Sequence, residues 1–142
     1  YEKLCAELDI PILSPEIAAG SIYTRADWIR RGASDMSRID VLRGGVTGVR
    51  KMAAICEAFG IKCEVHMSGF ANLQLLGASS EDVCEYYERG LLAPGVDEET
   101  PLPYLEEICD PLDDDGYVTV PTEPGMGYRL IHDYIEENRV SE

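Results

Sequence analysis

The chain is poor in basic residues. Its 142 residues include 12 lysines and arginines against 27 aspartates and glutamates, which gives a formal net charge of −15. Nucleic acids and anionic membranes are bound through basic patches, so this charge argues against both as partners. An anionic small molecule is not excluded, because a bound metal ion reverses the local field.

The sequence also lacks a long apolar run and any C-x-x-C pair. No apolar stretch approaches the roughly 18 residues that cross a membrane, and no segment resembles a signal peptide. The number of cysteines is odd and most lie inside apolar runs, which predicts buried, reduced thiols and a cytoplasmic protein. The cysteines are Cys5, Cys56, Cys63, Cys84 and Cys109.

The most informative stretch runs from residue 40 to residue 69 and reads DVLRGGVTGVRKMAAICEAFGIKCEVHMSG. After the acidic residue and a Gly-Gly pair comes a segment of helical period, then a glycine stop and a short strand over 62–65. The apolar face of this helix comprises Val46, Val49, Met52, Ala53, Cys56 and Phe59. GGVTG lacks the spacing and the lysine of a P-loop, so we interpret it as a tight turn between strand and helix.

Asp40 and His66 each follow a strand of this strand–helix–strand unit. Such units build parallel sheets with right-handed crossovers, so both side chains are expected at one edge of the sheet, where catalytic groups of α/β folds collect. A carboxylate beside an imidazole fixes its tautomer, which predicts a hydrogen bond of about 2.6–3.2 Å between the two. The spacing is equally compatible with an alternative in which Asp40 is an acidic turn residue and His66 is unrelated to it.

The same alternation of helices and strands continues on both sides. We expect a helix over 1–8, a strand over 10–13, a helix over 25–31, strands over 33–39 and 84–87, and a helix over 68–78. Glu16 follows the first strand, where a solvated loop or a helix N-terminus would also suit it. Alternation along the last strand puts Glu85 and Glu88 on opposite faces, so only one of them is expected to point inward.

Beyond residue 90 the composition changes to turns and acidic runs. The runs at 97–99 and 113–115 lack the spacing of a calcium loop and are expected on a solvated surface. A short strand over 117–120 and a helix over 128–138 are expected in this part.

The sequence motifs between residues 32 and 78 resemble the sixth and seventh β/α units of the enolase superfamily, in its mandelate racemase/muconate lactonizing enzyme-like group. They resemble its sugar-acid dehydratases most of all. The matching positions are Gly32, Ala33, Asp35 and Asp40 in GASDMSRID, Gly44 to Thr47 in GGVTG, and His66 in EVHMSGFANLQLLGA. The segment between Asp40 and the glycines is one residue shorter than is usual in the family.

The resemblance implies an α/β fold that is the C-terminal half of a (β/α)8 (TIM-like) barrel, strands five to eight. A whole barrel needs about 250 residues. Residues 1–95 are expected to form this half, and 96–142 a C-terminal extension that packs toward a capping domain outside this sequence. The missing N-terminal half of the same barrel is then a required partner, and a homo-oligomer is expected.

The resemblance also implies site roles and a reaction. Glu16 would ligate Mg²⁺, and Glu88 would face the substrate carboxylate. His66 would act as general base or acid, with Asp40 holding its ring. The reaction implied is Mg²⁺-dependent removal of a proton next to a carboxylate, with loss of water from a sugar acid.

Parts of this site are expected outside the sequence. Two further metal ligands and a lysine base belong to earlier strands, so the chain alone is expected to be inactive. Three alternatives remain: a racemase or epimerase of a 2-hydroxy acid, a non-catalytic barrel scaffold, and a small self-contained α/β binding module.

Overall fold

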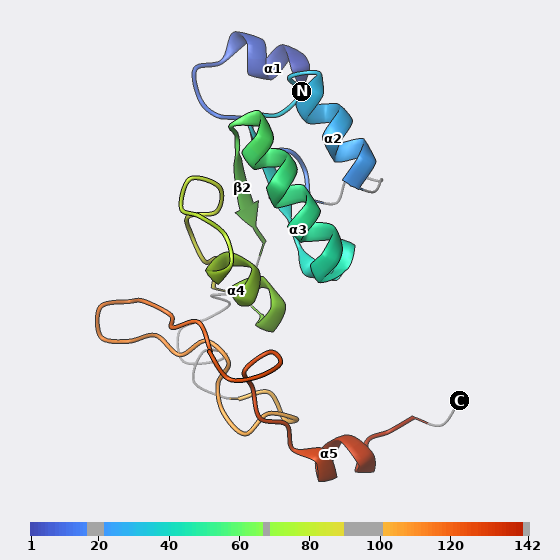
Figure 1. The fold of residues 1–142 in the computed structure, drawn as a ribbon, viewed down its shortest axis with the longest axis vertical. Helices are drawn as coiled ribbons and strands as arrows, with labels where there is room; N and C mark the ends of the chain where they lie inside the picture. The colour runs from blue at the N-terminus through green and yellow to red at the C-terminus, as the bar shows by residue number, and fades with distance from the viewer. Residues whose placement is uncertain (17–21, 67–68, 90–100, 141–142) are drawn as a thin grey trace.

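The computed structural model describes residues 1–16, 22–66, 69–89 and 101–140 (Figure 1). Its elements in chain order are α1 (Glu2–Glu7), α2 (Ile22–Arg30), β1 (Met36–Ile39), α3 (Val41–Phe59), β2 (Lys62–Val65), α4 (Phe70–Gly77) and α5 (His132–Glu137). Among these described elements, none is a helix long and apolar enough to cross a membrane.

Four chain segments run in parallel, each beside the next. β1 and β2 pair with Met36 opposite Lys62. Single parallel bridges from Leu13 to Met36 and from Val65 to Tyr87 add one neighbour on each side. The parallel arrangement predicted from the sequence is therefore confirmed, whereas the two outer segments are isolated bridges rather than strands. Prolines at positions 11 and 15 flank the first of them and cannot donate to a ladder.

The core lies between this sheet and the helices on one face. Burial alternates along both strands, so that one residue in two faces the helices. These strand residues are Ser37, Ile39, Cys63 and Val65. α3 covers them with Val49, Met52, Ala53 and Cys56. The predicted helix face is thus confirmed in its interior and wrong at its ends, since Val46 is 47% and Phe59 54% exposed.

α3 begins five residues earlier than the sequence suggested. Asp40 is its N-cap, and the carboxylate accepts a hydrogen bond of 2.9 Å from the backbone N–H of Leu42. Gly45 interrupts the helix with φ 63° and ψ 169°, which separates a first turn from the rest. The Gly-Gly segment is therefore a kink within a helix and not a turn in front of one. Gly60, with φ 66°, ends the helix as predicted.

The opposite face of the sheet carries charged side chains. Lys62 forms an ion pair with Glu85, and Arg38 forms one with Glu88. Arg38 and Lys62 lie on the same face by strand alternation, so both glutamates are directed to it. The expected opposition of Glu85 and Glu88 fails because no regular strand forms there. The segment contacts β2 through an isolated bridge at Tyr87 and a hydrogen bond from the N–H of Cys63 to the carbonyl of Val83.

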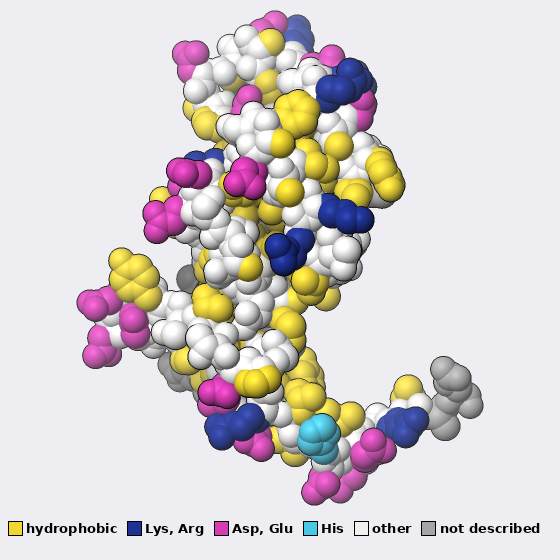
Figure 2. Space-filling model, in the orientation of Figure 1, with side chains coloured by type: hydrophobic (Ala, Val, Ile, Leu, Met, Phe, Trp, Pro, Cys, Tyr) yellow, Lys and Arg dark blue, Asp and Glu magenta, His cyan; other side chains and the backbone are white. Residues whose placement is uncertain are grey.

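The C-terminal extension is described over residues 101–140. Antiparallel bridges join Leu105 to Leu130 and Leu112 to Val118, and α5 is shorter than the predicted helix. Gln74 of α4 donates a 2.9 Å hydrogen bond to the carbonyl of Pro121 and so ties the extension to the half-barrel. The proposed boundary near residue 95 lies outside the described residues. On the face drawn in Figure 2, acidic side chains are spread along the whole length of the molecule.

The cysteines carry free thiols, as predicted. Cys56, Cys63 and Cys84 are buried in the core, and the other two are half-buried. Burial and neighbouring thiols raise the pKa of Cys63, with hydrogen bonding to Cys56 as the largest cause.

Candidate active site

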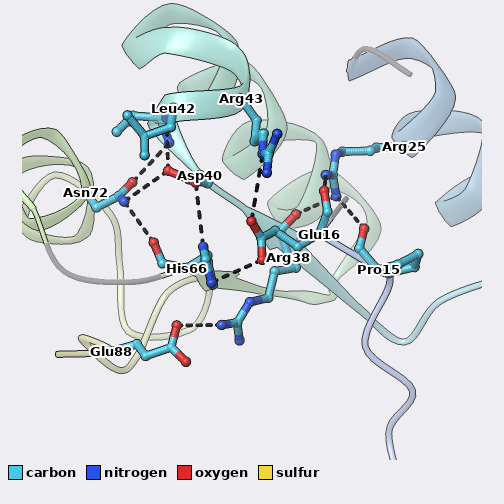
Figure 3. Close-up of polar contacts among 11 residues, drawn as sticks. Pro15, Glu16, Arg25, Arg38, Asp40, Leu42, Arg43, His66, Asn72 and Glu88 are labelled. Atoms are coloured by element: carbon cyan, nitrogen blue, oxygen red, sulfur yellow. Dashed lines mark hydrogen bonds and ion pairs between the residues drawn. The ribbon is translucent and has the colours of Figure 1, made fainter. Parts of the chain in front are cut away.

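Three of the four predicted site residues meet at the carboxyl edge of the sheet. The backbone N–H of His66 donates to the carbonyl of Ile39 at 2.7 Å, which continues the ladder past β2 and brings His66 beside Asp40. The segment carrying Glu16 runs parallel to β1, since Leu13 bridges to Met36 and the N–H of Ser14 donates to the carbonyl of Met36 at 2.9 Å. Glu16 follows two residues later, toward the same edge. Figure 3 shows the imidazole between the two carboxylates.

The ring of His66 faces a carboxylate at each nitrogen. Nε2 lies 3.1 Å from Oε2 of Glu16, and Nδ1 lies 3.6 Å from Oδ2 of Asp40. The second distance is longer than the predicted hydrogen bond, and within the described part of the chain Nδ1 has no hydrogen-bond partner. The predicted hydrogen bond between Asp40 and His66 is therefore wrong, although the two side chains lie next to each other. The closer contact of the ring is with Glu16.

Asp40 is fixed by other groups. Its Oδ1 accepts from the N–H of Leu42 at 2.9 Å and from Nδ2 of Asn72 at 3.2 Å. The side chain is 4% exposed. Because the helix cap holds Oδ1, only Oδ2 remains to face His66.

Asn72 of α4 joins both strand ends. Its Nδ2 also donates to the backbone carbonyl of His66 at 2.8 Å, and its Oδ1 accepts from the N–H of Val41 at 3.1 Å. Together with the contact to Asp40, both donors and the acceptor of this buried amide are used. A single side chain thus fixes Asp40, the start of α3 and the histidine backbone relative to one another.

Glu16 is held through its backbone by Arg25 of α2. Nη2 of Arg25 donates to the carbonyl of Glu16 at 2.6 Å, and Nη1 donates to the carbonyl of Arg38 at 2.5 Å. One planar guanidinium therefore clamps the Glu16 segment to β1. The carboxylate itself is 17% exposed and lies 3.8 Å from Nε of Arg43.

Glu88 reaches the site region by its side chain and contacts Arg38. Its Oε2 accepts from Nη2 of Arg38, and the carboxylate is 46% exposed (Figure 3). A carboxylate that faces the substrate cannot keep its oxygen on Arg38 at the same time. The predicted function of Glu88 therefore stays a prediction that requires this pair to open.

The donor set matches one part of a magnesium site. Ligand atoms of Glu16, Asp40 and His66 lie within 4.8 Å of one another. Mg²⁺ takes oxygen ligands in octahedral geometry, so an imidazole does not suit it and the helix cap already uses Oδ1 of Asp40. Glu16 fits as a single hard ligand, and the three residues together do not form a complete magnesium cage.

Sequence reasoning missed Asn72 and Arg25 as site residues. Asn72 lies three and four residues before Leu75 and Leu76, within the apolar stripe of α4, and an amide at a core position is a sign of buried hydrogen bonding. Arg25 gave no comparable signal, because an arginine early in an amphipathic helix is usually solvated.

The chain is similar to several solved structures. It is 42% identical to D-glucarate dehydratase from Agrobacterium tumefaciens complexed with magnesium, over 99% of this chain and 36% of that one, with a TM-score of 0.89. It is 27% identical to L-talarate dehydratase from Polaromonas sp. JS666, complexed with Mg and L-glucarate, over 91% of this chain and 31% of that one, with a TM-score of 0.70.

A more distant match supports the fold alone. It is a mandelate racemase/muconate lactonizing enzyme from a marine actinobacterium, at 21% identity and a TM-score of 0.69, over 99% of this chain and 38% of that one. The chain thus spans about a third of the length of the solved relatives it matches. No functionally curated protein matches the sequence.

The parallel half-barrel and its edge cluster agree with one family. The family described as Enolase C-terminal domain-like matches residues 1–134, which is most of the chain. The chain therefore belongs to the enolase superfamily, in its mandelate racemase/muconate lactonizing enzyme-like group.

Proposed function

We propose that the full-length protein containing this chain is a Mg²⁺-dependent dehydratase of a sugar acid, with an aldarate such as D-glucarate as substrate. The observation that carries the proposal is the 42% identity to D-glucarate dehydratase over 99% of the chain. The cluster of Glu16, Asp40 and His66 supports it, because these residues supply one hard metal ligand and one positioned imidazole.

The chemistry divides between the metal and the chain. When bound, Mg²⁺ would stabilise the negative charge that develops on the substrate carboxylate as the adjacent proton leaves. Glu16 would supply one of its ligands. The α-proton would pass to a base and the neighbouring hydroxyl would leave with a proton from an acid, so that water is lost in total, and the enol product would convert to a 2-keto-3-deoxy acid.

His66 is the group in this chain that moves a proton. Its Nε2 would accept the α-proton or protonate the departing hydroxyl. Asp40 lies 3.6 Å from Nδ1, and a closer approach that forms a hydrogen bond would keep a proton on Nδ1 and leave Nε2 for substrate. Asn72 holds the backbone of His66 and the carboxylate of Asp40 in register.

The test uses the full-length protein with Mg²⁺ and a panel of aldarates and aldonates, with keto-acid formation as the readout. His66→Asn is expected to lower kcat by a factor of about 10²–10⁴, the usual contribution of a general acid or base. His132→Asn is the matched control, because His132 begins the exposed helix α5 in the C-terminal extension.

Three outcomes contradict parts of the proposal. Exchange or inversion at the α-carbon without any keto acid would make the protein a racemase or epimerase. No turnover of any kind, with Mg²⁺ bound, would favour a non-catalytic scaffold. Full activity of His66→Asn would remove His66 from the reaction even if the reaction is dehydration.

A further inference from the structure

A partly buried series of hydrogen bonds connects the C-terminal extension with the candidate active site. The hydroxyl of Tyr87 donates to Oδ2 of Asp110 at 2.8 Å and accepts from the backbone N–H of Gly69 at 2.8 Å. Tyr87 also bridges to Val65 of β2. Asp110 belongs to the extension, and Gly69 is the N-cap residue of α4. One hydroxyl therefore links three parts of the chain.

The two partners of the Tyr87 hydroxyl, Asp110 and Gly69, are themselves constrained. Asp110 is 6% exposed, and its Oδ1 lies 3.7 Å from Nε of Arg89. Burial raises the pKa of Tyr87, with the charge of Asp110 as a further cause, so the hydroxyl keeps the proton that it donates. Gly69 has φ 135°, a backbone conformation that residues with a side chain rarely adopt, so this junction favours glycine.

The position of Gly69 determines where α4 begins. The N–H of Leu73 donates to the carbonyl of Gly69 at 3.1 Å, which closes the first turn. Asn72 lies within this turn and donates to the carbonyl of His66 and to Oδ1 of Asp40. A displacement of the start of α4 therefore moves Asn72 and, with it, the two residues that it holds.

We propose that Tyr87 and Asp110 are positioning residues that set the geometry of the His66–Asp40 pair through α4. This gives the C-terminal extension a part in catalysis in addition to any packing role. The inference rests on the proposed function of His66, and it goes beyond that proposal by assigning roles to two residues outside the cluster of Glu16, Asp40 and His66.

A purely structural clamp predicts a different result. Loss of such a clamp lowers stability but leaves the folded enzyme unchanged. Loss of a positioning group lowers kcat in the folded enzyme while substrate affinity is largely kept, and it changes the surroundings of the His66 ring.

The experiment compares full-length Tyr87→Phe with Tyr86→Phe. Tyr86 is the adjacent tyrosine and is 69% exposed in this chain, so the control removes the same hydroxyl from a neighbouring position. We expect Tyr87→Phe to lower kcat on the order of 10-fold with KM within about 2-fold, because small misplacements of catalytic groups have effects of this size or larger. Tyr86→Phe is expected to match wild type.

A second readout does not depend on activity. In protein labelled with ¹³C-histidine, the His66 ring signal is assigned by its loss in His66→Asn. That signal is expected to shift in Tyr87→Phe and to stay in place in Tyr86→Phe. An unshifted His66 signal in folded Tyr87→Phe, together with wild-type kcat, would overturn the inference.

Asp110 provides the rescue test and a second variant should Tyr87→Phe fail to fold. Asp110→Asn keeps an oxygen that accepts from Tyr87, whereas Asp110→Ala does not. We expect the His66 signal and kcat of Asp110→Asn to lie closer to wild type than those of Asp110→Ala. Equal effects of the two substitutions would contradict a role for the hydrogen bond between Tyr87 and Asp110. If wild type turns over no sugar acid at all, the proposed function fails, and the histidine signal still decides whether Tyr87 and Asp110 position His66.

Discussion

Nε2 of His66 lies 3.1 Å from Oε2 of Glu16, which joins the predicted proton carrier directly to the predicted metal ligand. A protonated ring can donate to Glu16 on one side and toward Asp40 on the other. Glu16 cannot offer the same lone pair to the ring and to a metal ion. Nε2 is therefore expected to be released toward substrate when Glu16 acts as a ligand.

Replacing Glu16 by glutamine is expected to weaken Mg²⁺ binding by the full-length protein at least about 10-fold, which is the lower bound even for residues that only support metal ligands. The neutral amide loses the charge that a hard cation prefers. Isothermal titration with MgCl₂ measures the affinity. Glu57→Gln, at an exposed position near the far end of α3, is the control. Unchanged affinity in Glu16→Gln would show that the ligand lies elsewhere.

Replacing Arg25 by lysine is expected to loosen the Glu16 segment. An ammonium group presents one nitrogen and cannot reach the carbonyls of Glu16 and Arg38 as the guanidinium fork does. We expect a loss of about 1–2 kcal/mol in unfolding free energy and weaker Mg²⁺ binding. Arg30→Lys, whose guanidinium is 67% exposed and pairs with Asp27, should change stability by less than about 0.5 kcal/mol. Equal effects of both variants in chemical denaturation would argue against the clamp.

Replacing Asn72 by aspartate is expected to be severe. A carboxylate cannot donate, so the bonds to Asp40 and to the His66 carbonyl are lost and a second negative charge is placed beside Asp40. Leaving buried groups unsatisfied predicts a destabilisation of about 2–4 kcal/mol. Asn138→Asp, at the exposed C-cap of α5, is expected to change stability by no more than about 0.5 kcal/mol. The comparison is made by urea unfolding, and a mild effect at position 72 would contradict the buried network.

Two glycines of α3 and its cap should respond oppositely to alanine. Gly60 has φ 66°, so Gly60→Ala strains the backbone and is expected to lose about 1 kcal/mol. Gly48 is helical, and a Cβ there would meet Cγ2 of Ile22 at an ordinary 3.9 Å, so Gly48→Ala is expected to gain about 0.5–1 kcal/mol. Melting temperatures that shift in the same direction would be inconsistent with this description of α3.

Cys109 is expected to react slowly with alkylating reagents. Burial, with Asp110 nearby, raises the pKa of its thiol from 9.0 to about 11, which lowers the thiolate fraction at pH 8 about 100-fold. Peptide mass spectrometry after iodoacetamide treatment should show faster labelling in urea than in the native state, and a native rate that keeps rising toward pH 11. The same shift makes this thiol stabilise the fold below pH 9 and lose that contribution as pH rises through 11. Labelling as fast in the native protein as in urea would contradict the burial.

Much of the fold could be predicted because strand–helix alternation is a local signal. The position of β2 follows from a glycine stop and four residues of strand pattern, and the parallel order follows from the connections. The outer bridges at Leu13 and Tyr87 were predicted as strands because a sequence window cannot show how many residues a neighbour will pair with. The start of α3 was misplaced since Gly44 and Gly45 were interpreted as a turn, although the capping side chain of Asp40 had already begun a helical turn.

The sequence predicted which residues meet at the edge of the sheet better than it predicted the contacts between them. Strand ends located Glu16, Asp40 and His66 at one edge, because that rule depends on topology alone. The contact of His66 with Glu16 was not predicted. It depends on how Arg25 holds the backbone of Glu16, which lies nine residues earlier in the sequence than Arg25. Such contacts between distant segments leave no periodic trace in a sequence.

The break at Gly45 separates the first turn of α3, at the rim of the site, from the part of the helix that is buried. The first turn of α3 carries Leu42, which is 89% exposed, and Arg43, whose Nε lies 3.8 Å from Glu16. The fully buried residues of the helix begin only at Val49, beyond the break. Val41 still packs against the core and donates to Asn72, so the backbone of this first turn is fixed. The side chains of Leu42 and Arg43 lie outside that packing, and substitutions at these two positions can therefore alter the rim of the site without repacking the interior.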